Sequence, residues 1–228
     1  MLSDRDLQKL ALTHELITPF DPNDFEGATI NLRLGQTIRK YNSNESIILG
    51  KEVFEDDYLE IDLSENDFFL KPGESVLIQT YEFINVPETL SARVYERYSI
   101  KSLGLMISPA HYLNPGYRGN ISLLAINHSA VPIRLTPGIK ICQIGFFALS
   151  SIPLKPYEKQ DGKYMDAKDV SISKLHLDRD IQEFLKQKGI SRVSDDMAKA
   201  LGDHLMGHIR ESAKRLADTI RNEQDLFL

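Results

Sequence analysis

The sequence predicts a mainly β protein: a distorted jelly-roll, of the barrel or sandwich kind, with a short helix before it and a helical extension after it. Between about residues 28 and 149, short runs of alternating apolar and polar residues are separated by Gly and Pro-Gly turns. Residues 3–14 carry the start signals of a helix. Residues 178–188 and 194–222 carry helical periodicity instead of alternation.

The first helix is expected to begin after Ser3 and to end near His14. Asp6 stands three residues after Ser3, as in a capping box, so the Ser3 side chain is expected to accept from the first-turn N–H groups. Leu7 and Leu10 would form the apolar side of this short amphipathic helix.

The β region contains the same strand-turn-strand pattern twice. Residues 68–70, a Pro-Gly turn and residues 75–78 read as strand, turn and strand, and residues 134–141 repeat this with Leu135-Thr136-Pro137-Gly138. The repeat predicts two similar hairpins. Short strands punctuated by turns in this way are typical of a jelly-roll.

The C-terminal third changes character. Residues 153–173 are polar and turn-rich, which predicts an extended arm, and the helix over 178–188 should end at Gly189. We expect a β domain over 1–173 and a helical extension over 174–228. One face of the 194–222 helix is lined by apolar residues, and this stripe must pack on its own domain, on a sister subunit or on a different protein partner. Its members are Met197, Leu201, Leu205, Ile209, Ala213, Leu216 and Ile220.

The composition excludes several classes of protein. The formal net charge is −6, from 27 basic and 33 acidic residues, which argues against sequence-independent nucleic-acid binding. The single cysteine, Cys142, rules out an internal disulfide framework and a cysteine-rich zinc site, and its apolar surroundings predict a buried thiol. His204 and His208 have metal-ligand spacing but no third ligand in view, so we expect no metal site. Without a signal peptide or an apolar run of about 18 residues, we expect a cytoplasmic protein that does not enter a membrane.

Residues 96–106 and 110–121 carry the most specific pattern in the chain. Arg97-Tyr98-Ser99 leads into Leu103-Gly104-Leu105-Met106, and Ala110-His111 leads into Asn114-Pro115-Gly116-Tyr117-Arg118-Gly119. This resembles the dCTP deaminase family of the dUTPase superfamily. The segments 2–6, 31–35, 132–144 and 156–164 fit the same family, so the resemblance covers about residues 1–170.

The resemblance implies a dUTPase-like jelly-roll, a homotrimer and nucleotide sites between subunits. Enzymes of this family hydrolyse the 4-amino group of dCTP to give dUTP and ammonia without zinc, and some also cleave dUTP to dUMP. Mg²⁺ accompanies the triphosphate. The family positions that contact nucleotide are occupied here by Arg97, Ser99, Ala110, His111, Lys163 and Tyr164.

The positions that carry chemistry in the family hold other residues. The glutamate that moves protons corresponds to Leu124, the arginine that polarises the base to Ser102, and the first serine after Arg97 to Tyr98. The aspartate that acts on water in dUTPases corresponds to Asn114. A leucine cannot transfer a proton and an asparagine is not a general base. The resemblance therefore identifies no residue of this chain as catalytic.

Three functions remain open from the sequence. The favoured one is a catalytically degenerate trimer that binds a deoxynucleotide as a sensor or scaffold. The second is an active dCTP deaminase with rearranged groups, for example one using Glu96 or a carboxylate from another subunit. The third is a structural or interaction protein without a ligand, in which Tyr98 fills the pocket.

Overall fold

The structure is a computed structural model, which describes residues 1–107, 112–160, 162–189 and 195–224. Its contacts form two compact units. The first comprises Met1–Asn42 and Glu55–Ile172, and the second comprises Ser43–Phe54 and Ser173–Leu228. The domain boundary expected after residue 173 stays a prediction, and the segment Ser43–Phe54 belongs to the second unit although the sequence reading left it in the β domain.

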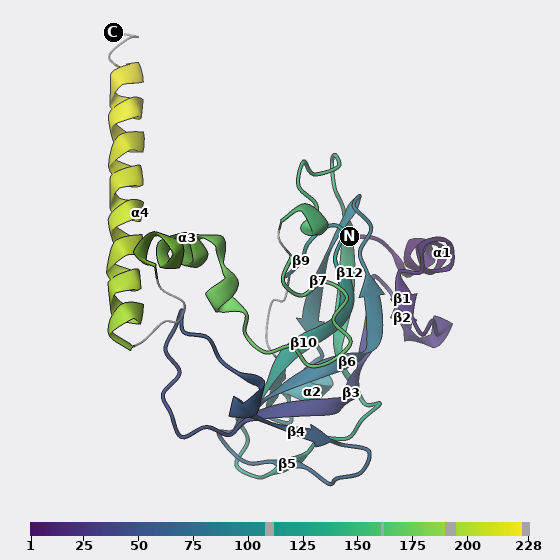
Figure 1. The fold of residues 1–228 in the computed structure, drawn as a ribbon. Helices are drawn as coiled ribbons and strands as arrows, with labels where there is room; N and C mark the ends of the chain where they lie inside the picture. Colours follow the sequence, from purple (N-terminus) through teal and green to yellow (C-terminus); the bar gives the residue numbers. More distant parts are fainter. Residues whose placement is uncertain (108–111, 161, 190–194, 225–228) are drawn as a thin grey trace. The chain divides into compact units, whose positions relative to one another are not determined.

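The first unit is built on a curled antiparallel sheet (Figure 1). Along its main path the described strands run in the order β8-β10-β6-β3-β12-β7-β9, and β1, β2 and β4 pair from its sides. The mainly β prediction, with helices at both ends of the chain, is confirmed. The strands are β1 (Ile17–Thr18), β2 (Phe25–Glu26), β3 (Thr29–Tyr41), β4 (Tyr58–Asp62), β6 (Ser75–Asn85), β7 (Leu90–Glu96), β8 (Leu105–Ile107), β9 (Tyr112–Leu113), β10 (Arg118–Asn127) and β12 (Lys140–Ala148).

Alternation along the strands places one face of the sheet in the core. On β10, Ile121, Leu123 and Ala125 are buried, whereas the residues between them are half-buried. Cys142 is fully buried, as predicted, and burial raises the pKa of its thiol. The buried thiol is a packing residue of the core.

The first helix, α1, spans Asp4–His14, and its buried residues are Leu7 and Ala11. The expected capping bond is wrong: the Ser3 hydroxyl does not cap the backbone but donates to the carboxylate of Asp6 at 3.1 Å. The Ser3 backbone carbonyl accepts from the Leu7 N–H at 2.9 Å, so the first bond of the helix forms without a side-chain cap.

The two Pro-Gly units do not make two hairpins. The strands that precede them, β5 (Phe69–Leu70) and β11 (Ile133–Arg134), pair with each other in a separate two-stranded sheet. Gly73 (φ +78°) and Gly138 (φ +79°) then turn the chain into β6 and β12 of the main sheet. Each Pro-Gly turn therefore carries the chain from the two-stranded sheet into the main sheet.

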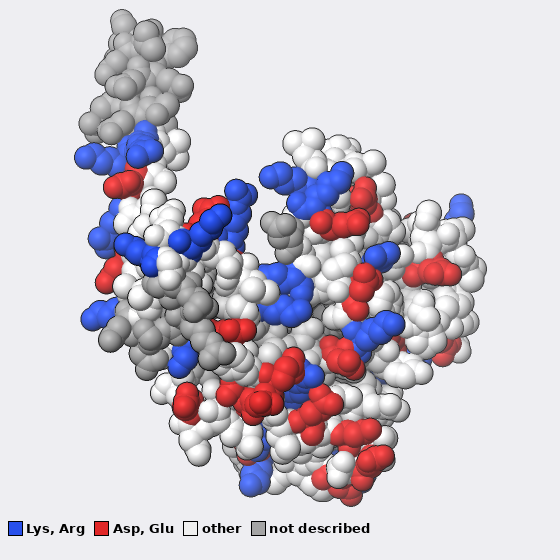
Figure 2. Space-filling model, viewed as in Figure 1, with Lys and Arg blue, Asp and Glu red and all other residues white. Residues whose placement is uncertain are grey.

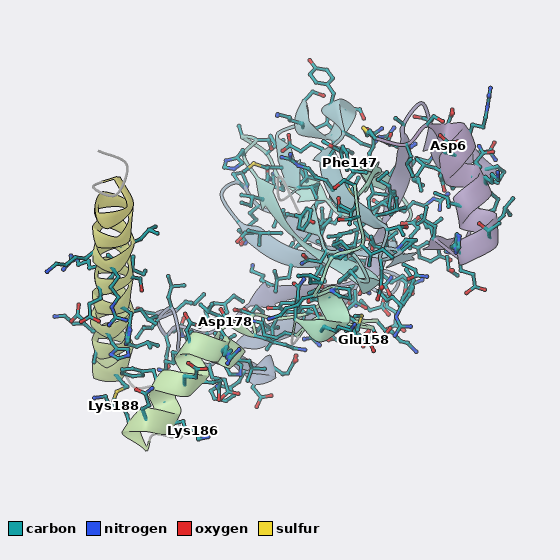
Figure 3. The ribbon with its side chains drawn as sticks, turned by 90° about the horizontal axis from the view of Figure 1, so that it is seen from above. Asp6, Phe147, Glu158, Asp178, Lys186 and Lys188 are labelled. Atoms are coloured by element: carbon teal, nitrogen blue, oxygen red, sulfur yellow. The ribbon has the colours of Figure 1, made fainter. Side chains whose placement is uncertain are left out.

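The second unit is helical. It contains α3 (Arg179–Lys188) and α4 (Asp195–Gln224), preceded by a single 3-10 turn, η4 (Leu175–Leu177). Gly189 closes α3 in the left-handed conformation (φ 66°), as predicted. Figure 3 shows Asp178 at the start of α3 and Lys186 and Lys188 at its end, which complements the helix dipole. Among the described residues, no helix combines the length and apolarity that crossing a membrane requires.

Candidate functional site

Arg97 stands where β7 gives way to the short helix α2 (Tyr98–Lys101). Its Nη1 donates to the carbonyl of Lys140 on β12 at 3.1 Å, and the side chain is half-buried. Ser99 is exposed and Tyr98 is 84% exposed. Ser102 follows α2, where its hydroxyl donates to the Ser99 carbonyl at 3.4 Å. Three of the predicted positions thus occupy one turn beside Arg97.

Glu96, the alternative catalytic carboxylate, is engaged in an ion pair. Its Oε2 lies 2.8 Å from Nζ of Lys101, and this hydrogen bond raises the pKa of Lys101. The Glu96 side chain is 22% exposed in this pair. The lysine next to the family's arginine position therefore neutralises the carboxylate next to Arg97.

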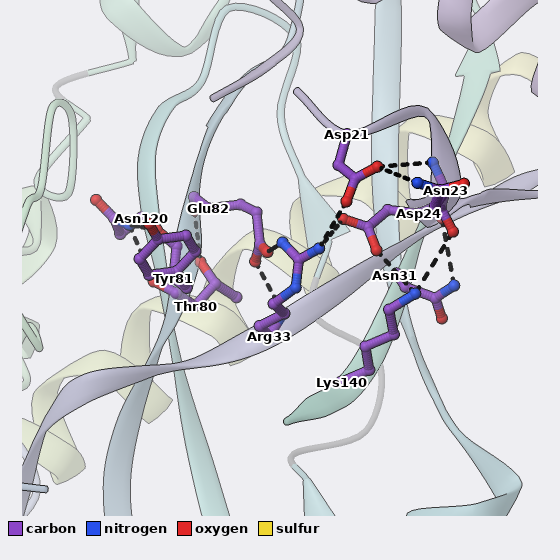
Figure 4. A network of polar contacts seen from close by, with 10 residues as sticks. All are labelled: Asp21, Asn23, Asp24, Asn31, Arg33, Thr80, Tyr81, Glu82, Asn120 and Lys140. Carbon is purple, nitrogen blue, oxygen red and sulfur yellow. Dashed lines mark hydrogen bonds and ion pairs between the residues drawn. The ribbon is translucent and has the colours of Figure 1, made fainter. Parts of the chain in front are cut away.

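A charged network is centred on Arg33 (Figure 4). Arg33, on β3, bonds Glu82 of β6 through Nη1 at 2.9 Å and through its backbone N–H at 2.8 Å. Its Nη2 bonds Asp24, from the 3-10 turn η1 (Pro22–Asp24), and approaches Asp21 at 3.5 Å. The side chains of Glu82 and Asp24 are 0% and 4% exposed. Burial raises the pKa of Glu82, and the hydrogen bonds and charge of Arg33 oppose that rise.

Lys140 joins this network to Arg97. Its Nζ lies 2.8 Å from Oδ1 of Asp24, and its carbonyl is the acceptor for Arg97. Sequence reasoning missed the network, because Arg33 stands at a polar position of the alternating run over residues 29–34 and no local pattern marks it as an ion-paired residue. The network therefore holds the strand end against which Arg97 is anchored.

The arm expected over residues 153–173 lies along β10 of its own chain. The Asn120 N–H donates to the Ala167 carbonyl at 2.8 Å, and the Asp166 N–H donates to the Arg118 carbonyl at 2.8 Å. Further along, the Ser171 N–H donates to Oγ of Ser122 at 2.8 Å. Arg118 also forms an ion pair with Asp166 at 3.0 Å. The strand that carries Leu124 is thus lined by the arm that carries Lys163 and Tyr164.

Leu124 is half-buried on the outer face of β10, opposite Leu77 of β6. On the arm, Lys163 and Tyr164 are both half-buried, and the Tyr164 N–H donates to Oη of Tyr157 at 3.2 Å. The Asn114 carbonyl accepts from the Tyr117 N–H at 3.1 Å in the turn before β10.

The predicted residues divide between two parts of the sheet. Arg97 and Ser99 follow β7, beside β12, whereas Leu124 and the arm belong to β10; β6, β3 and β12 lie between β10 and β7 along the strand path. The polypeptide also connects the two parts, because α2 leads into β8, which pairs with the far end of β10. Ala110 and His111 lie outside the described residues. Among the residues that are described, no three His, Cys, Asp or Glu side chains gather in a metal-binding group.

A family model described as dCTP deaminase-like matches residues 1–149. A relative from Nanoarchaeum equitans, named "dCTP deaminase, dUMP-forming", is 31% identical over 196 residues, covering 78% of this chain and 98% of its own. The protein of the same name from Dictyoglomus turgidum is 36% identical over 191 residues, covering 80% of this chain and 98% of its own. The similarity thus spans nearly the whole of each relative.

A solved structure shares the fold. The 2'-deoxycytidine 5'-triphosphate deaminase of Agrobacterium tumefaciens superposes with a TM-score of 0.52 at 21% identity. The match covers 65% of this chain and 47% of that one, so this chain spans about half the length of that protein. The β sheet, the sequence match over residues 1–149 and the full-length similarity to the relatives agree, and the chain belongs to the dCTP deaminase-like family.

Proposed function

We propose that this chain binds a pyrimidine deoxynucleoside triphosphate between the subunits of a homotrimer and does not deaminate it, acting as a nucleotide sensor or scaffold. The observation that carries the proposal is Leu124. It occupies the position that corresponds to the family's proton-transferring glutamate, half-buried on the strand that the arm lines. A cytoplasmic location, expected from the sequence, would give such a protein access to the deoxynucleotide pool.

Arg97 has the geometry of a phosphate ligand. One of its guanidinium nitrogens is fixed on the Lys140 carbonyl, and its remaining N–H groups donate no hydrogen bond to a described residue. A half-buried guanidinium that is anchored at one end and keeps donors available suits a phosphate oxygen. Ser99 is exposed on the next turn and can add a hydroxyl donor. Mg²⁺ would enter with the triphosphate, whose oxygens are ligands that this ion prefers.

The division of the predicted residues supports a site shared between subunits. Arg97 and Ser99 follow β7, whereas Lys163 and Tyr164 lie on the arm along β10. A second copy could bring the arm of one chain to the α2 turn of another, as the family's inter-subunit sites imply. Closed symmetric association of this kind is the usual state of soluble oligomers.

The chemistry of deamination requires a group that takes a proton from water and delivers one to the ring and to the leaving amine. Leu124 and Asn114 cannot serve as general bases. Glu96 is the carboxylate nearest to Arg97 in sequence, and Lys101 holds it in an ion pair at 2.8 Å. The chain's own residues thus support binding and orientation of a nucleotide better than turnover.

A second candidate is an active dCTP deaminase with rearranged groups, which the names of the relatives favour. In that case a carboxylate from another part of the assembly would replace the missing glutamate.

Ligand binding is tested by thermal denaturation of the full chain with each deoxynucleoside triphosphate and Mg²⁺. A ligand at 100 times its dissociation constant adds about 2.7 kcal/mol to the free energy of unfolding, which raises Tm by several degrees. Lys163→Met should weaken the rise, because it removes a cation from the arm. Lys168→Met is the control, since Lys168 is an exposed lysine on the same arm and is not among the residues expected to bind nucleotide. Equal rises in both variants, or no rise with any nucleotide, would contradict the proposed binding role.

A further inference from the structure

Only the N-terminal part of the apolar stripe of α4 is packed in the second unit. This part packs on α3: Leu201 is buried with Ile181, Phe184 and Leu185 of α3, and Met197 and Leu205 border this cluster. Met197, Leu201 and Leu205 recur every four residues, so they follow one side of the helix.

The stripe continues beyond the contact with α3, because Ile209 lies one turn after Leu205 and Leu216 three turns after it, both within about 40° of its direction. Met206, Ile209 and Leu216 are 50%, 61% and 63% exposed, and Ala213 between them is exposed as well. Their spacing of three, four and three residues keeps them in one line, and Ile220 continues the same spacing in the sequence. An exposed apolar line of this kind on a long helix favours packing against another helix.

We propose that this exposed part of the stripe is the seam of a parallel coiled coil between α4 helices of separate copies of this chain. Met206, Ala213 and Ile220 take the a positions of the heptad, and Ile209 and Leu216 take the d positions. The seam has two heptads, because Glu223 occupies the next d position. This length is short for an isolated coiled coil, and the inference therefore rests on the proposed homo-oligomer, which raises the effective concentration of the helices.

The charge pattern selects a second copy over a different partner. In coiled coils, charged residues at the e and g positions choose the partner and its orientation. From residue 205 to residue 224 these positions hold Leu205, Arg210, Ser212, Ala217, Thr219 and Gln224. Only Arg210 is charged, so a parallel copy meets no like charge across the seam, and a complementary acidic or basic helix finds nothing to recognise. Figure 2 shows basic and acidic side chains together along the described part of α4, without a patch of one sign.

Site-directed cross-linking of the full chain tests the seam. In a parallel coiled coil a d residue faces the same residue of the neighbouring helix, so Leu216→Cys should form a disulfide between copies under mild oxidation. The natural Cys142 is fully buried and does not compete. Glu211→Cys is the matched control, because Glu211 is exposed on the opposite side of the helix, at an f position. We expect Leu216→Cys to cross-link about tenfold faster than the control because the seam raises the local thiol concentration.

Each outcome decides the inference. Preferential cross-linking at residue 216 supports the seam, and its loss when Ile209→Glu is added confirms that the apolar face drives it. Equal rates at 211 and 216, or no cross-link at 216 in protein that retains native helix content by circular dichroism, overturn it. Antiparallel pairing would instead link Met206→Cys of one copy to Leu216→Cys of another, and this result also overturns it. Nucleotide binding is measured separately by Tm, so a failed seam and a failed nucleotide site give different results.

Discussion

Replacing Arg33 by methionine tests the charged network that Lys140 joins to Arg97. Methionine has an apolar side chain of similar length, but it lacks the guanidinium that bonds Glu82 and Asp24, whose side chains are 0% and 4% exposed. Breaking one partner of a buried ion pair costs about 3–5 kcal/mol. Asp24 retains Lys140 at 2.8 Å, and Glu82 retains the Arg33 backbone N–H at 2.8 Å, so we expect the lower end, about 3 kcal/mol.

Urea denaturation at neutral pH, followed by circular dichroism, measures this loss. Arg134→Met is the control, because Arg134 and Asp67 form a pair whose side chains are 55% and 64% exposed, and such pairs contribute about 1 kcal/mol or less. A loss in Arg33→Met no larger than in Arg134→Met would refute the account of the network.

The pH dependence of the free energy of unfolding provides a second test of the same variant. The pKa of Glu82 is raised in the folded protein, so the folded state holds this proton more tightly than the unfolded chain does. Stability from this group is therefore highest when Glu82 is protonated, and it falls as pH rises from the ordinary carboxyl value through the raised one. Removing the Arg33 charge should raise this pKa further, so the difference between wild type and Arg33→Met should shrink toward acidic pH.

Three further outcomes are expected. Gly119→Ala should release the arm from β10, because Gly119 has φ +147° and a methyl group there would lie 3.1 Å from the backbone nitrogen of Ala167. Trypsin should therefore cut the arm of this variant faster than the arm of the control variant Gly138→Ala. Gly138 has φ +79°, but nothing lies within 4 Å of the added carbon. Leu124→Glu should not restore ammonia release from dCTP, since the other substituted positions remain, and turnover in this variant would identify Leu124 as the sole missing group. Glu74→Gln should destabilise the protein at neutral pH, because the Lys71 N–H and Lys40 lower the pKa of Glu74 in the folded protein. The extra stability of wild type should disappear as pH falls from the ordinary carboxyl pKa through the lowered pKa of Glu74. A difference in urea midpoint between the two proteins that persists at low pH would contradict this expectation.

The sequence predicted the elements whose signals are local. The helix ending at Gly189 and the burial of Cys142 follow from a left-handed cap residue and from apolar neighbours, and the structure confirms both. The hairpins predicted around the Pro-Gly turns are wrong for a physical reason. A turn sequence fixes that the chain changes direction, but whether β5 pairs with β6 or with β11 depends on contacts more than 60 residues apart.

The candidate site divides in the same way. The motif around Arg97 was readable because it is continuous in sequence. The bond from Arg97 to the Lys140 carbonyl joins residues 43 positions apart, and the pair of Arg33 with Glu82 joins residues 49 positions apart. No local sequence pattern encodes those partners. The general rule that a buried charge requires an opposite charge indicates that partners exist, but it does not identify them.

Ammonia release from dCTP with Mg²⁺, measured on the purified full chain, tests whether this protein keeps the fold without deaminating the nucleotide. The Dictyoglomus turgidum protein named "dCTP deaminase, dUMP-forming" serves as the positive control in the same assay. We predict no ammonia and no dUMP from this chain under conditions in which a nucleotide raises its Tm. Turnover that Arg97→Met abolishes would contradict the account and would show that another group performs the proton transfer that Leu124 cannot.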